Sequence, residues 1–122
     1  MFGFGGMVWG RKEMKMGEKV QKYTAHELEI MAQIKRLRLC VLVHSIIYYR
    51  LNTSIISDFQ YDKFAKKLKA LQDKYGKLSA GVVEYRKEFE GWDGCSGYNL
   101  PLGDIWGYNK ALYLVREFGT DN

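Results

Sequence analysis

The sequence predicts an all-α protein, and three features of the chain support that prediction. Apolar residues recur at every third or fourth position over 18–51 and again over 57–76, which is the period of an amphipathic helix. Ser57 precedes Gln60 by three residues, the spacing of a capping box that opens a helix. The single proline lies outside both segments. We therefore expect four helices with short links, built around an antiparallel hairpin of about 24–51 and 57–76.

The first helix is expected to span 18–51. Thr24 and Glu27 form a second possible capping box, so a start near residue 24 is the alternative. From Leu39 onward, apolar residues cover nearly the whole circumference, and the last helix of the chain is expected to cover this half. On the same buried face, His44 is expected to be a hydrogen-bonded core histidine. The apolar stripe consists of Val20, Tyr23, Ile30, Ile34, Leu37, Val41, His44, Tyr48 and Leu51.

The second helix, 57–76, is expected to stop at Gly76, because glycine commonly follows the last helical residue. A short third helix is expected over 79–90 from its mixed apolar face. A small sheet using Val82 and Val83, or Tyr113 to Val115, is the disfavoured alternative.

A loop and a last helix complete the predicted fold. Three glycines and the proline mark 91–101 as a loop, and its Trp92 and Tyr98 predict that it packs against the body of the protein. The last helix is expected over 102–118, ending before Gly119.

The N-terminal residues 1–17 are rich in glycine and show neither helical nor strand periodicity. We expect a flexible arm here, followed by one helical domain over 18–122. Met14 and Met16 are alternative starts of the natural protein. The arm also carries large apolar side chains that are costly to leave in water, which favours a protein partner or a second copy of the chain as its binding surface. These candidate partner-binding residues are Phe2, Phe4, Val8 and Trp9.

Composition and charge describe an ordinary soluble chain. The net charge is +5, and the two cysteines, Cys40 and Cys95, lie in no Cys-x-x-Cys motif, which favours a reducing, cytoplasmic compartment. The most apolar run, 39–49, is about half of the ~20 residues that cross a bilayer, so no membrane association is expected. No metal site is expected either, because His26 and His44 are too far apart in the sequence to form a ligand pair.

Lysines gather on the second helix, and two interpretations of them remain open. The simpler is a solvated polar face, and the other is a patch that contacts phosphates. Aromatic residues do not alternate with these lysines, so binding of single-stranded nucleic acid has little support. The lysines are Lys63, Lys66, Lys67, Lys69, Lys74 and Lys77.

The clearest candidate site lies at the joint of the predicted hairpin. Tyr48 and Tyr49 close the first helix, and Asp58, Tyr61 and Asp62 share one face of the first turn of the second helix. Aromatic rings on both sides and two carboxylates beside them suit a flat ring that carries polar groups.

This pattern resembles the helical subdomain at the front of NAD-dependent DNA ligases. The family carries Tyr-Tyr, six residues, Ile-Ser-Asp, then Tyr-Asp-x-Leu, and a Leu-rich helix follows. The resemblance covers about 25–78 and departs from the family at Phe64, where leucine is usual, and at Ser54, where proline is common. It implies that the hairpin recognises the nicotinamide mononucleotide (NMN) half of NAD. Tyr48 and Tyr61 would then flank the nicotinamide ring, and Tyr49, Asp58 and Asp62 would supply polar contacts.

The chain lacks the catalytic lysine that this resemblance would require of a ligase. Ligases use a Lys-x-Asp-Gly motif whose lysine takes the adenylate covalently. The one Asp-Gly pair here is Asp93-Gly94, and the residue two before Asp93 is Gly91. We therefore expect no enzyme activity and no DNA ligation by this chain alone.

Three functions remain as alternatives. The first is weak, non-catalytic binding of NMN or NAD, with a companion surface supplied either by the Trp92–Tyr98 loop or by a second protein. The second is a protein-interaction role without a small molecule, since small ligase-related chains resemble accessory products of phages that act as virion or host-takeover components. The third is an accessory subunit of a split NAD-dependent ligase. The expected location is the cytoplasm of a bacterial host, or the virion.

Overall fold

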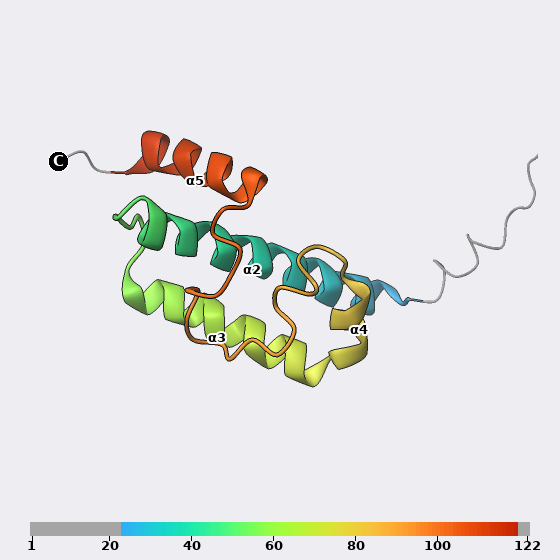
Figure 1. Ribbon diagram of the computed structural model, residues 1–122. Helices are drawn as coiled ribbons and strands as arrows, with labels where there is room; N and C mark the ends of the chain where they lie inside the picture. The colour runs from blue at the N-terminus through green and yellow to red at the C-terminus, as the bar shows by residue number, and fades with distance from the viewer. Residues whose placement is uncertain (1–22, 120–122) are drawn as a thin grey trace, which may run out of the picture.

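The computed structural model describes residues 23–119 and confirms the all-α fold (Figure 1). Four helices occur within this range, and none of its residues forms a strand: α2 (Ala25–Arg50), α3 (Asp58–Lys74), α4 (Gly76–Gly81) and α5 (Ile105–Phe118). The helices α2 and α3 lie side by side and antiparallel, while α5 lies along the other side of α2. The predicted arm, 1–17, lies outside the described residues, as does the part of the first predicted helix before residue 23.

Local capping explains where the hairpin helices begin. The Thr24 hydroxyl accepts a hydrogen bond from the Glu27 amide at 3.0 Å, and the Glu27 carboxylate accepts one from the Thr24 amide at 3.0 Å. The same reciprocal pair joins Ser57 and Gln60 at the start of α3, at 3.1 and 3.4 Å. Both predicted capping boxes are confirmed, and α2 has the alternative start near residue 24.

The turn between the hairpin helices is closed by backbone hydrogen bonds. The Leu51 amide donates to the carbonyls of Ile46 and Ile47, both at 3.2 Å. Asn52 follows in the left-handed region, with φ of 55°, where asparagine is better tolerated than most residues. The chain thereby reverses and delivers the start of α3 beside the end of α2.

The core runs along α2, whose C-terminal half is buried between α3 and α5. This confirms the prediction that the last helix covers the fully apolar half of the first. The helices α2 and α5 approach closely at Gly107, where an added Cβ would lie 2.8 Å from the Ile46 side chain. Side chains with no exposed surface are Ile34, Val41, Leu42, Ile46, Ile47, Ala65, Leu68 and Ala111.

The helix predicted over 79–90 is wrong: α4 covers Gly76–Gly81, and turns follow it. The first reason is Arg38 of α2, which is 2% exposed. Its guanidinium donates to the carbonyls of Ser79 at 3.1 Å and of Val82 and Glu84 at 2.8 Å. Further bonds to the Ser79 hydroxyl and the Gln72 side chain complete its partners. The Ser79 carbonyl also accepts from the Val82 amide at 3.1 Å, whereas the carbonyls of Val82 and Glu84 point at Arg38 and not along a helical ladder.

The second reason is the backbone of Tyr85, whose φ of 55° is incompatible with a right-handed helix. Its hydroxyl donates to the Asp104 carboxylate at 2.7 Å, and burial together with this bond raises the pKa of Tyr85. The same carboxylate oxygen accepts from the Gly107 amide at 2.8 Å and caps α5. The segment after α4 is therefore tied both to α2 and to the start of α5.

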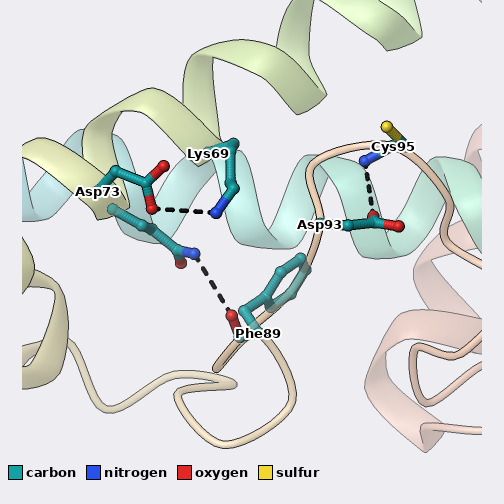
Figure 2. Close-up of polar contacts among 6 residues, drawn as sticks. Lys69, Asp73, Phe89, Asp93 and Cys95 are labelled. Carbon is teal, nitrogen blue, oxygen red and sulfur yellow. Dashed lines mark hydrogen bonds and ion pairs between the residues drawn. The ribbon is translucent and has the colours of Figure 1, made fainter.

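Further along, this segment crosses α3. The Gln72 side chain of α3 donates to the Phe89 carbonyl at 3.4 Å. Figure 2 shows Phe89 and, beyond it, Asp93, whose carboxylate accepts from the Cys95 amide at 2.9 Å. Trp92 is buried edge-to-face against Phe89, with 5.2 Å between ring centroids. The prediction that 91–101 packs against the body is confirmed at Trp92, whereas Tyr98 is exposed.

Candidate functional site

A cavity of about 380 Å³ lies at the joint of the hairpin and gathers all five residues predicted as the candidate site. They come from the last turn of α2 and the first turns of α3. The segment after α4 supplies the remaining side of the cavity. The lining residues are His44, Ser45, Tyr48, Tyr49, Ser54, Ile56, Ser57, Asp58, Phe59, Tyr61, Asp62, Cys95 and Gly97.

Two tyrosines from the end of α2 form the aromatic side of the site. Tyr48 is 57% exposed, and its ring meets Tyr49 edge-to-face with centroids 4.9 Å apart. Tyr98, from the segment after α4, meets the Tyr49 ring in the same edge-to-face manner at 5.6 Å. Tyr49 is thus held between two aromatic neighbours, and Tyr48 keeps exposed ring surface at the cavity.

The opposite side comes from α3 and carries the charge. Burial raises the pKa of Tyr61, whose hydroxyl lies 3.0 Å from the Ser45 hydroxyl, so the phenol is neutral at physiological pH. Asp58 and Asp62 are exposed on the same face of the helix. Asp62 forms an exposed ion pair with Lys66 at 3.6 Å. Exposed ion pairs contribute little to the free energy of folding, so a cationic ligand can replace Lys66 as the partner of this carboxylate.

His44 does not have the hydrogen-bonded core environment predicted for it. The residue lines the cavity, and its Nδ1 is buried without a hydrogen-bond partner among residues 23–119. Burial lowers the pKa of His44, so the imidazole is neutral at pH 7. An unpaired acceptor costs less than an unpaired donor, which favours the tautomer whose proton is on Nε2.

Among the lining residues that sequence reasoning did not assign to the site, Ser45, Cys95 and Gly97 matter most for its geometry. Ser45 lies four positions before Tyr49 on a helix, so its place on the same face was readable from the spacing. Cys95 and Gly97 come from a loop more than thirty residues further along, and no local pattern indicates their position.

Three further features of residues 23–119 bear on function: metal ligation, the lysines of α3 and the length of the apolar helices. No cluster of three or more histidine, cysteine or acidic residues in this part of the chain is arranged to hold a metal ion. Two lysines of α3, Lys66 and Lys69, pair with acidic residues one turn away on the same helix, which favours the solvated-face interpretation. None of the described helices is long and apolar enough to cross a membrane.

Comparison with known families bears on the hairpin. Residues 27–80 match the family model described as DNA ligase-like, N-terminal NAD+-binding domain. The resemblance to the N-terminal subdomain of NAD-dependent DNA ligases is confirmed. The match takes in nearly all of α2, the whole of α3 and most of α4, and includes all five predicted site residues; it ends before Cys95 and Gly97. No curated protein and no solved structure matches the chain.

The residues of the cavity fit the nicotinamide half of a dinucleotide on chemical grounds. The nicotinamide ring of NMN and of NAD is a flat pyridinium that carries a positive charge. Exposed tyrosine rings attract such a cation through their electron-rich faces, and the carboxylates of Asp58 and Asp62 add direct charge attraction.

Proposed function

We propose that this chain is a non-catalytic binding protein for a nicotinamide nucleotide, either NMN or the NMN half of NAD. The observation that carries the proposal is the cavity of about 380 Å³ at the hairpin joint, which gathers Tyr48, Tyr49, Asp58, Tyr61 and Asp62. The match of the surrounding hairpin to an NAD+-binding family supports it.

In this proposal, Tyr48 and Tyr61 flank the nicotinamide ring, and Tyr49 with the two aspartates makes the polar contacts. Each aromatic contact adds roughly 0.5–1.5 kcal/mol beyond the burial of its area. The site is partly open, and several of its side chains are exposed. We therefore expect weak binding, with a dissociation constant of about 1 mM, which corresponds to about 4 kcal/mol.

The absence of a Lys-x-Asp-Gly motif supports a role without adenylate transfer. After incubation with labelled NAD, the protein is expected to carry no covalent adenylate. A labelled band that survives denaturation and disappears when one lysine is replaced would contradict this part of the proposal.

The binding proposal is tested by measuring NMN affinity with ligand-observed NMR for the wild type and two matched variants. Asp62→Ala removes a site carboxylate that also pairs with Lys66 one turn away. Asp73→Ala removes a carboxylate on the same helix, paired in the same way with Lys69 but distant from the cavity. The expected result is loss of binding for Asp62→Ala and wild-type affinity for Asp73→Ala, with helicity unchanged in both.

Equal affinity for NMN in both variants would mean that the hairpin carboxylate takes no part in binding. No binding by the wild type at about 10 mM, ten times the expected dissociation constant, would overturn the proposed function itself.

A second candidate is a protein-interaction role, as in a phage-type virion or host-takeover component, and the outer face of α5 favours it. Four large apolar side chains share this face and remain exposed: Ile105, Trp106, Leu112 and Tyr113. The occupant we propose is a second copy of the chain, with the arm residues Phe2, Phe4, Val8 and Trp9 adding to the contact.

Light scattering tests this candidate. The full chain is expected to associate, and both a double substitution Ile105→Ser/Leu112→Ser and deletion of residues 1–14 are expected to weaken the association without lowering the melting temperature of the helical core. A full-length chain that stays monomeric at every concentration would contradict it. An accessory role in a split ligase is distinguished by activity: the chain would then restore NAD-dependent sealing to a ligase that lacks this subdomain.

A further inference from the structure

We propose that the segment Cys95–Tyr98 is the second wall of the nicotinamide site and positions the ligand against the hairpin. This inference rests on the proposed function and extends it, because the segment lies outside the family match at 27–80. The companion surface of the half-open hairpin is thus supplied by the same chain, not by a second protein.

The closest approach is made by Gly97, whose backbone lies directly on the paired hydroxyls of Ser45 and Tyr61. A Cβ added at Gly97 would overlap the Ser45 hydroxyl and lie 3.0 Å from the Tyr61 hydroxyl. Any side chain here must therefore displace the segment or break the Ser45–Tyr61 pair, which fixes the orientation of the Tyr61 ring.

Tyr98 extends the same wall to the aromatic side of the site. Its ring meets Tyr49 edge-to-face at 5.6 Å, and Tyr49 in turn meets Tyr48 at 4.9 Å. The three rings form a continuous row from the segment to the exposed face of Tyr48. Removal of the Tyr98 ring leaves Tyr49 free to rotate away from the orientation in which it faces the cavity.

The wall is held in place before any ligand arrives. The Trp92 indole is buried and donates to the Ser96 carbonyl at 2.9 Å. The Asp93 carboxylate accepts from the Cys95 and Ser96 amides at 2.9 and 3.3 Å, and the Ser96 hydroxyl accepts from the Tyr98 amide at 3.1 Å. A segment ordered in this way loses little conformational freedom on binding, so it strengthens the interaction with a small ligand.

Cys95 gives a direct readout of this arrangement, because it lines the cavity and is exposed. The other cysteine, Cys40, is partly buried, and burial raises the pKa of its thiol to about 11, so it reacts slowly and serves as an internal control. Alkylation of both thiols by iodoacetamide is followed by mass spectrometry of the full chain, with and without NMN.

The expected result is that NMN slows alkylation of Cys95 about tenfold at a concentration ten times its dissociation constant, in proportion to the occupied fraction. The rate at Cys40 should not change. AMP, which carries a phosphate and a ribose but no nicotinamide, should leave both rates unchanged at the same concentration.

Three variants of the segment complete the test. Gly97→Ala is expected to weaken NMN binding about tenfold or more, whereas Gly103→Ala, where an added Cβ meets nothing within 4 Å, should bind as the wild type does. Tyr98→Ala removes an exposed side chain and so should leave the fold intact, yet weaken binding about threefold to tenfold. If Gly97→Ala fails to fold, the Tyr98→Ala variant still tests the proposal.

The outcomes separate this inference from the function on which it rests. NMN could shift the amide signals of residues 48–62 while Cys95 stays unprotected and Tyr98→Ala binds normally. That result would contradict the proposal that Cys95–Tyr98 is a second wall, and the proposed function would stand. If NMN shifts no signal of the hairpin, both fail together.

Discussion

The hairpin and the segment between α4 and α5 both line the candidate cavity, but different interactions hold them. The hairpin helices begin at their own capping boxes, Thr24 with Glu27 and Ser57 with Gln60, which act over three residues. The segment 82–104 has no regular secondary structure and is fixed by side chains from distant parts of the chain. One wall of the site is therefore encoded locally, and the other depends on a few long-range contacts, so single substitutions should affect the two very differently.

The largest expected effect comes from Arg38, whose replacement by methionine leaves the buried carbonyl of Val82 without a donor and removes the guanidinium from the buried carbonyl and hydroxyl of Ser79. We expect Arg38→Met to lower the free energy of unfolding by about 3–5 kcal/mol. The control is Arg36→Met, which removes an exposed arginine of the same helix and should change stability by less than about 0.5 kcal/mol. Chemical denaturation measures both, and equal stabilities would mean that Arg38 does not hold the segment.

The next effect concerns Tyr85, which joins the segment to α5. Tyr85→Phe removes the hydroxyl that donates to Asp104, a bond to a charged group that contributes about 1.5–3 kcal/mol. The matched control, Tyr113→Phe, alters an exposed tyrosine of α5 and should be neutral. Hydrogen exchange should further show faster opening of the first turn of α5 in Tyr85→Phe alone; unchanged exchange there would contradict the link.

Loss of a cap should have a smaller effect, since it is a local interaction. Ser57→Ala and Thr24→Ala are each expected to lower stability by about 1 kcal/mol, and the losses should add because the two caps are far apart. Thr53→Ala, in the exposed turn between the helices, is the control. Thermal unfolding of the single and double variants measures this, and a double variant no less stable than the singles would count against independent caps.

The smallest effect is a pH dependence from His44. Burial lowers the pKa of His44 in the folded protein below its ordinary value of 6.5, so the unfolded chain takes up the proton first as the pH falls. The stability associated with neutral His44 is fully present above pH 6.5 and is lost as the pH falls from 6.5 toward the folded value. Between about pH 7.5 and 5.5, the melting temperature of the wild type and of His26→Gln should fall more than that of His44→Gln. Parallel curves for all three would show that His44 is not desolvated.

The same contrast explains how much the sequence predicted. Helical periodicity and two capping boxes predicted α2, α3 and their antiparallel pairing, and the spacing of Asp58, Tyr61 and Asp62 placed them on one face of the site. Each of these signals acts within a few residues. The match at 27–80 confirmed the family resemblance drawn from the same residues.

The predictions that failed depended on contacts across long stretches of sequence. The helix expected over 79–90 gives way to turns because Arg38, more than forty residues away, binds the carbonyls of Val82 and Glu84. Arg38 lies four residues after Ile34 and three before Val41, so helical spacing predicts its place on the buried stripe. The spacing gives no information about which carbonyls its guanidinium binds. Gly97 was recognised only as a loop glycine, and its packing on Ser45 has no sequence signature.

The most direct test of the proposed site is a protein-observed NMR titration of the full chain with NMN, because it reports both walls in one experiment. We expect the amide signals of residues 44–62 and 95–98 to shift together with one dissociation constant of about 1 mM, while those of the outer face of α5 do not shift. Shifts confined to residues 44–62 would contradict the proposal that Cys95–Tyr98 forms the second wall of the site. No shift in either region at about 10 mM NMN would contradict the claim that this cavity binds a nicotinamide nucleotide.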